Sequence, residues 1–153
     1  MNTFLHDAQS ELKRAEHLIY VSLKYTRTVD VFRSIIERLI NAFDCSIDGL
    51  LQQALDEQKI SSIPPARKLK CEKLLSLYTD DKVLHENMDF YHHLRAISRA
   101  KYTRRSEYRR HVTMIATLAD EITEINIDII HEFFNKTKEF SEYVKGLATE
   151  EDA

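Results

Sequence analysis

The residues best suited to chemistry lie together in one stretch of the chain, between positions 99 and 111. This stretch combines basic side chains with two tyrosines and one histidine, namely Arg99, Lys101, Tyr102, Arg104, Arg105, Tyr108, Arg109, Arg110 and His111. Guanidinium groups match the geometry of phosphate oxygens, and tyrosine rings can stack on nucleic-acid bases. The composition of this stretch therefore indicates binding of RNA or of nucleotide phosphates.

The distribution of charge along the chain supports the same interpretation. Positions 95–110 hold seven basic residues and one acidic residue, whereas positions 117–153 hold ten acidic and three basic residues. The net charge of the whole chain is only −3. The segregation of charge is therefore more informative than the total.

An arginine and a histidine within this stretch stand at a spacing that suits catalysis. His111 lies seven positions after Arg104 and six after Arg105, and the sequence does not choose between the two arginines. If the segment is helical, Arg104 lies two turns before His111, close to the same face. The competing interpretation is a non-enzymatic helical protein-interaction module, in which the arginines are a solvated face and His111 is packed beside the core.

Composition excludes several familiar classes of enzyme site. With two glycines in the chain, neither a P-loop nor a dinucleotide-binding fingerprint can form. There is no His-Glu-x-x-His motif and no pair of Glu-x-x-His motifs. Glu86, Asp89, His92 and His93 form one cluster without a matching second cluster, which is more typical of a solvated face than of a metal site. We therefore expect no metal and no cofactor.

The cysteines and the apolar runs bear on the location of the protein. Cys45 and Cys71 form no CxxC motif and no dense framework, which indicates a reducing compartment. The first residues lack the basic and apolar regions of a signal peptide. No apolar run approaches the ~20 residues needed to span a bilayer. We therefore expect a cytoplasmic protein that does not contact a membrane.

Apolar residues that recur at three- and four-residue steps predict the helices that would position the basic stretch. Helices are expected over about residues 3–25, 29–57, 66–77 and 80–99, and a last helix longer than ~30 residues from about 103 to near Gly146. Short joints favour an all-α antiparallel bundle of four to five helices in one domain, 1–153, with a short, acidic, disordered tail from about residue 147. The basic stretch would open the last helix, whose free N–H groups favour anions.

The predicted last helix carries more apolar surface than one small bundle readily covers. Its apolar residues include Ile122, Ile129, Ile130, Phe133 and Phe134. Adjacent residues on a helix point about 100° apart, so one of each adjacent pair would face another chain. We therefore expect a homodimer with two-fold symmetry.

The pairs Arg104–His111 and Arg105–His111 match the Arg-x(4–6)-His motif of HEPN-domain proteins. The chain also resembles these proteins in its helical size, in its two long N-terminal helices and in a motif that opens the last long helix. The segment 16–57, which begins Glu16-His17-Leu18, is similar to the front half of such a domain. The resemblance covers most of residues 3–145.

The resemblance implies a homodimer in which the two motifs face each other across a cleft. It implies a metal-independent endoribonuclease of the toxin or RNA-processing type, or a member that only binds nucleotides or partners; some members pair with a small nucleotidyltransferase. In the enzymes the 2′-hydroxyl attacks the adjacent phosphate. His111 would act as general base or acid, and Arg104 or Arg105 would hold the phosphate and stabilise the transition state.

Overall fold

The computed structural model of the chain describes residues 2–152, with the backbone alone beyond residue 149. Its helices are α1 (Thr3–His17), the π-helical turn η1 (Leu18–Ser22), α2 (Leu23–Tyr25), α3 (Val29–Asp56), α4 (Arg67–Leu77), α5 (Lys82–Arg99) and α6 (Ile127–Asp152). A sheet of β1 (Lys101–Arg105), β2 (Thr113–Thr117) and β3 (Ile122–Ile125) separates α5 from α6. Helices account for 70% of the chain, so the mainly helical character of the predicted fold is confirmed.

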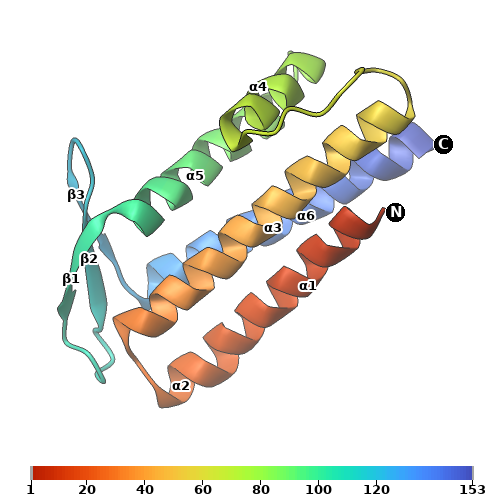
Figure 1. The fold of residues 1–153 in the computed structure, drawn as a ribbon. Helices are drawn as coiled ribbons and strands as arrows, with labels where there is room; N and C mark the ends of the chain where they lie inside the picture. The colour runs from red at the N-terminus through yellow and green to blue at the C-terminus, as the bar shows by residue number, and fades with distance from the viewer. Residues whose placement is uncertain (1, 153) are drawn as a thin grey trace.

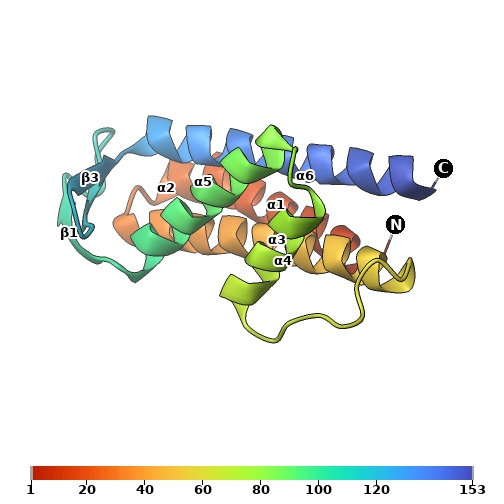
Figure 2. The same cartoon turned by 90° about the horizontal axis from the view of Figure 1, so that it is seen from above.

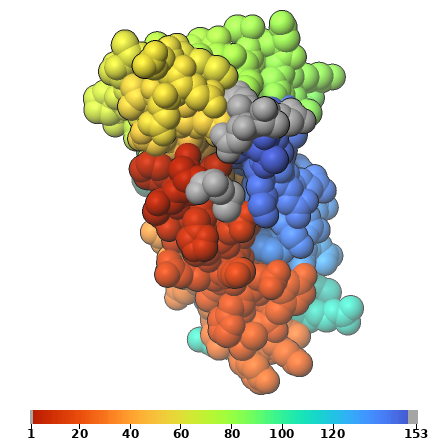
Figure 3. Space-filling model, turned by 90° about the vertical axis from the view of Figure 1, so that its right-hand side faces the viewer, coloured from red at the N-terminus to blue at the C-terminus, as the bar shows by residue number. Residues whose placement is uncertain are grey.

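The long helices lie side by side and the sheet closes one end of the molecule (Figure 1). Helix α3 packs against α1, α5 and α6, and α1 also packs against α6. The view from above shows α4 crossing α5 on the side of the bundle away from α1 (Figure 2). The face formed by α1 and α6 carries both chain termini at the end opposite the sheet (Figures 1 and 3).

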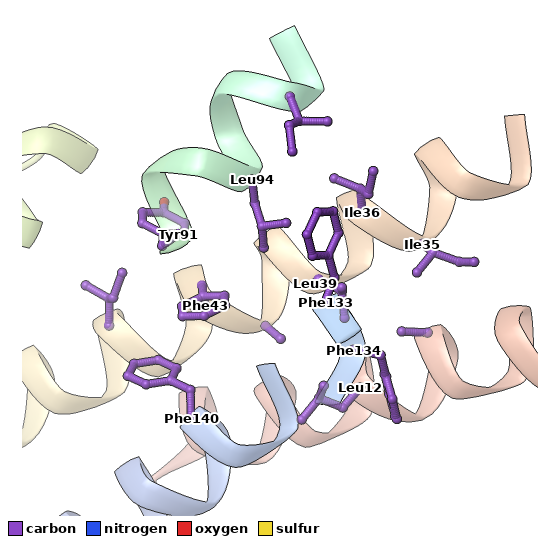
Figure 4. Close-up of a cluster of buried hydrophobic side chains, with 14 of the residues drawn as sticks. Leu12, Ile35, Ile36, Leu39, Phe43, Tyr91, Leu94, Phe133, Phe134 and Phe140 are labelled. Carbon is purple, nitrogen blue, oxygen red and sulfur yellow. The ribbon is translucent and has the colours of Figure 1, made fainter. Parts of the chain in front are cut away.

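The hydrophobic core is built around α3. The Phe43 ring stacks on Phe140 of α6 with 4.6 Å between ring centroids, and Tyr91 of α5 lies 5.4 Å away on a tilted plane. Figure 4 shows these rings with the aliphatic side chains that surround them. Stacked and tilted pairs are the favoured arrangements of aromatic rings in cores. Three helices are therefore held together at one aromatic cluster.

Local sequence explains where the helices begin. The side chains of Asn2, Thr28 and Asp81 accept hydrogen bonds from the backbone N–H groups of Leu5, Val31 and Leu84, which caps α1, α3 and α5. Gly49 allows the start of α1 to lie close to α3, because a Cβ at this position would come within 2.5 Å of the Leu5 side chain.

The prediction of an all-α fold is wrong for residues 101–125. This segment forms an antiparallel sheet in the order β1-β2-β3, with the pairs Arg105↔Thr113 and Met114↔Ile125. Val112, Met114 and Ala116 are fully buried at alternate positions, which is the period of a strand, although Thr113 between them is also buried. Apolar residues at 108, 112, 115, 119 and 122 happened to match a helical spacing as well, and the β-branched residues of the segment favoured the sheet.

The last helix is shorter than predicted and ends later. It has 26 residues, not more than ~30, and begins at Ile127 rather than near 103. It also continues through Gly146 to Asp152, so the predicted end at Gly146 and the loose tail from 147 are wrong over the residues described. Ala148 is buried, and its carbonyl oxygen accepts a hydrogen bond of 3.5 Å from Gln53. This contact holds the last turns of α6 on α3.

The apolar surplus that suggested a dimer is largely absent. Ile130, Phe133 and Phe134 are all buried within one chain, and Ile129 packs against the same core. Ile122 alone of the predicted set is exposed, at 68%. Most of the apolar surface on which the predicted dimer was based is therefore buried within one chain. Dimerisation stays a prediction. Over the residues searched, no helix has the length and apolarity that crossing a membrane requires.

Replacing the ring at the centre of the aromatic cluster should test the core. We expect Phe43→Ala to lower the free energy of unfolding by about 3–5 kcal/mol, because it leaves a cavity between three helices. Urea denaturation followed by circular dichroism measures this loss. Leu69→Ala, at a half-exposed position on α4, should change stability by less than about 0.5 kcal/mol; equal losses would contradict this description of the core.

Candidate functional site

The basic stretch lies on a β-hairpin and not at the start of a helix. Arg104 and Arg105 end β1, residues 106–112 form the connecting loop, and His111 stands two residues before β2. The predicted position of the motif at the opening of the last long helix is therefore wrong. The hairpin still brings the two ends of the motif close together, because Arg105 pairs with Thr113 across the ladder.

The two candidate arginines lie on opposite faces of the sheet, because side chains alternate along a strand. Arg104 is opposite Met114, which is buried, so Arg104 shares the face that looks toward the bundle. Arg105 is opposite Thr113 on the other face, and its guanidinium forms an ion pair of 2.7 Å with Glu124 of β3. The pleat thus separates the two arginines that the sequence could not distinguish.

Arg104 is engaged in contacts within the chain. Its guanidinium lies 3.0 Å from the Asp30 carboxylate and 3.5 Å from that of Glu107. The hydrogen bond to Asp30 raises the pKa of Arg104 above its ordinary value. The Tyr102 ring, which lies on the same face, has the guanidinium of Arg33 at 4.3 Å and that of Arg104 at 5.4 Å. These contacts join the sheet to α3.

The hairpin loop is attached to the N-terminus of α3. The Glu107 carboxylate accepts a hydrogen bond of 3.0 Å from the backbone N–H of Val29, the first residue of that helix. The backbone N–H of Tyr108 donates to the carbonyl oxygen of Arg27 at 2.7 Å. Ser106 and Tyr108 have φ angles of 57° and 66°, which side-chain-bearing residues rarely adopt. The two contacts to the α2–α3 joint hold the loop in this strained form.

A cavity of about 440 Å³ lies where the hairpin loop meets the start of α6. Arg105, Arg110 and His111 line it together with the Thr113 side chain. Residues 126–128, at the start of α6, also line it. Three of the predicted site residues are therefore brought to one cavity. Arg104 is not among the residues that line it.

The charges around this cavity favour an anion but include two acids. The start of α6 contributes the partial positive charge of a helix N-terminus, and the Asn126 side chain already caps the N–H of Ile129 at 2.9 Å. Asp128 lines the cavity and opposes a bound anion. Glu124 neutralises Arg105, but both side chains are more than half exposed, so the pair contributes about 1 kcal/mol or less.

The remaining predicted residues are dispersed. Lys101 is exposed on the Arg105 face of β1, and Tyr108 and Arg109 are exposed at the tip of the loop, with Tyr108 at 76%. Arg99 lies apart from the hairpin cavity, in a groove between α4 and α5. The predicted set is therefore divided among the hairpin cavity, the loop tip, the groove between α4 and α5, and the contact of Tyr102 and Arg104 with α3.

The described residues offer neither a metal-binding cluster nor a reactive thiol. Among residues 2–149, whose side chains the structure describes, no group of three or more histidine, cysteine or acidic residues could hold a metal ion. Burial, followed by the nearby Asp7 and Glu11 carboxylates, raises the pKa of the Cys45 thiol to about 11. Burial also raises the pKa of Cys71. Both thiols are therefore poor nucleophiles near neutral pH.

Scans against protein-family models, curated proteins and solved structures found no match for this chain. The function is therefore inferred from the geometry of the site.

Sequence reasoning missed the residues that build the site from other elements. Glu107 anchors the loop, and Thr113, Asn126 and Asp128 line the cavity. The β-branched residues Val112, Thr113, Ile115 and Thr117 favour a strand and were the available signal for the hairpin. Asn126 three residues before Ile129 is a capping signal that would have placed the start of α6.

Removing the loop anchor should destabilise the protein. The backbone N–H of Val29 is fully buried, so we expect Glu107→Ala to lower the free energy of unfolding by about 1–3 kcal/mol by leaving this donor unpaired. Chemical denaturation measures the loss. Glu107→Gln retains an acceptor oxygen and should lose less; a larger loss for glutamine than for alanine would refute the capping role.

Proposed function

We propose that this protein binds single-stranded RNA through the hairpin, with a backbone phosphate held in the cavity beside the start of α6. One observation carries the proposal: Arg105, Arg110 and His111, from two sides of the hairpin loop, line the same cavity. The two guanidinium groups can together donate several hydrogen bonds to phosphate oxygens. The first turn of α6 adds favourable electrostatics for a negative charge.

Exposed aromatic rings near the same end of the molecule favour a strand with unpaired bases. Tyr108 and Tyr25 are 76% and 79% exposed, and the hydrogen bond from Tyr108 to Arg27 ties their two segments together. Neither ring serves the core, whereas a ring held in solvent can stack on a base. In Figure 3 the cyan atoms of the sheet region project beside the orange end that holds α2.

The ion pair between Arg105 and Glu124 does not prevent phosphate binding. An exposed pair contributes about 1 kcal/mol or less, and a phosphate offers the same guanidinium a bidentate partner. Asp128 opposes phosphate binding more strongly than Glu124 does, because Asp128 lines the cavity itself. Its carboxylate would limit affinity without abolishing binding.

Metal-independent cleavage of the bound RNA is a second candidate, which the shared cavity of Arg105 and His111 favours. The 2′-oxygen would attack the adjacent phosphorus while His111 accepts the hydroxyl proton. The bond from phosphorus to the 5′-oxygen then breaks, the leaving oxygen takes a proton from water, and His111 releases the proton it accepted to the solvent. The products are a 2′,3′-cyclic phosphate and a 5′-hydroxyl. Arg105 would stabilise the charge that develops on the phosphoryl oxygens.

This chemistry is also what the resemblance to HEPN-domain proteins implies, along with a homodimer and a nucleotidyltransferase-type partner. The resemblance now rests on the arginine–histidine spacing and the long helices, since the motif stands on a hairpin. We retain the toxin or RNA-processing type of endoribonuclease as the specific form of this candidate. The RNA-binding proposal depends on neither the dimer nor the partner.

Charge removal inside the cavity should weaken RNA binding more than charge removal outside it. We expect Arg105→Gln to reduce affinity for single-stranded RNA and to lower the slope of log affinity against log salt by about 0.7, the value for one lost phosphate contact on a single strand. Fluorescence anisotropy over a salt series measures both quantities.

Arg104→Gln is the matched control, because it removes the same charge from the neighbouring position but from the opposite face. It should leave the salt slope nearly unchanged. Asp128→Asn removes the opposing acid and should strengthen binding. Equal losses for Arg104→Gln and Arg105→Gln would mean that charge in general, and not this cavity, attracts the RNA.

Loss of the imidazole should separate cleavage from binding. We expect His111→Ala to slow cleavage in EDTA by about 10²–10⁴, as for a lost general acid–base, with little change in affinity. Gel analysis of labelled RNA, with detection of the terminal cyclic phosphate, measures the rate and the product. His6→Ala, at an exposed position of α1, is the control. Cleavage that persists unchanged in His111→Ala would refute the catalytic role, and RNA binding without cleavage would limit the function to binding.

A further inference from the structure

A second basic groove lies between α4 and α5, away from the hairpin cavity. It has a volume of about 450 Å³. The charged and imidazole side chains that line it are Arg67, Lys68, Glu72, His92, Arg95 and Arg99. Five of the six are basic residues, and they come from two separate helices.

Acids among the described residues neutralise only one of the groove cations. Arg67 pairs with Asp48 at 3.0 Å and with Asp44 at 3.4 Å. Lys68, Arg95 and Arg99 form no ion pair with any residue in the described part of the chain. Glu72 is the one acid on the groove wall. The groove therefore carries an uncompensated positive charge.

Helix α5 places two of the groove cations close together. Arg95 and Arg99 lie four positions apart on α5, an arrangement in which like charges repel each other. The Arg95 guanidinium lies 5.5 Å from the centre of the Tyr91 ring, and the buried Tyr91 hydroxyl is bonded to Asp44. An anion in the groove would relieve the repulsion between these two cations, which form no ion pair within the described residues.

The groove is connected to the hairpin by the start of the sheet. Arg99 ends α5, and β1 begins two residues later at Lys101. At a rise of about 3.3 Å per residue, the backbone from Arg99 to Arg105 spans up to about 20 Å. Lys101 stands between the two sites and is exposed. A nucleic-acid strand several nucleotides long can follow this line of cations.

We propose that the α4–α5 groove is a second phosphate-binding site, which holds the backbone of the same single-stranded RNA several nucleotides from the hairpin cavity. This inference rests on the proposed RNA-binding function. The groove supplies point contacts to phosphates, while the hairpin supplies the cavity and the exposed rings. Together the two sites set the minimum length of RNA that binds with full affinity.

The test asks how the loss of affinity caused by substitutions at each site depends on the length of the RNA. Fluorescence anisotropy is measured for oligonucleotides of about 4 and about 12 nucleotides, the range covered by small single-strand binding domains. The groove variant carries Lys68→Gln and Arg99→Gln, and the hairpin variant carries Arg105→Gln and Arg110→Gln. The charge-matched control carries Lys73→Gln and Lys82→Gln, two exposed positions outside both sites. Circular dichroism confirms that each variant is folded.

We expect the groove variant to lose about tenfold in affinity for the long RNA and less than about twofold for the short one, with a salt slope lower by about 0.7 per lost contact. The hairpin variant should lose affinity for both lengths, and the control for neither. Equal losses by the groove variant and the control, or a groove loss independent of length, would overturn this inference and leave the hairpin proposal intact. Failure of the unaltered protein to bind either RNA would overturn both.

Discussion

Helix α3 is buried on more than one side, and the rest of the structure follows from that constraint. The adjacent pairs Ile35–Ile36, Ala42–Phe43 and Leu50–Leu51 are buried at both positions, although neighbouring residues point about 100° apart. One partner helix cannot cover such a surface, so α1, α5 and α6 must all pack on α3. The burial extends to its first residue, and the hairpin loop supplies the acceptor that this end of the helix requires.

Most of the helices could be predicted because their stripes of apolar residues are long and fit only the helical period. The expected helix over 29–57 differs from α3 (Val29–Asp56) by one residue, and Thr28 caps it as predicted. The main failure lies in residues 100–126, where short strands of four and five residues alternate with turns that contain no glycine, and the end of the last helix was also placed too early. A segment whose apolar positions fit two periods is decided by tertiary pairing, which the local sequence does not contain.

The residue types of the candidate site could be predicted from the sequence, but which of these residues lie together in one cavity could not. Arginine, tyrosine and histidine in one basic stretch indicated phosphate binding regardless of fold. The grouping depends on the pleat of β1, which sends Arg104 toward Asp30 and leaves Arg105 beside the His111 cavity. Under a helical reading, positions seven residues apart share a face. In the hairpin, Arg105 rather than Arg104 lies near His111, because Arg105 pairs with Thr113 across the ladder, so the helical argument favoured the arginine that lies outside the cavity.

The outer edge of β1 has a consequence for the solubility of the protein. In the order β1-β2-β3, β1 pairs on one side only, and such an edge is a template for a strand of another molecule. Arg104 and Arg105 on this edge are paired with Asp30 and Glu124, whereas Lys101 forms no ion pair with a described residue, so its charge opposes the pairing of two copies. Lys101 also lies between the two proposed RNA sites, so a substitution that removes its charge would weaken the proposed RNA binding and the protection against edge pairing together.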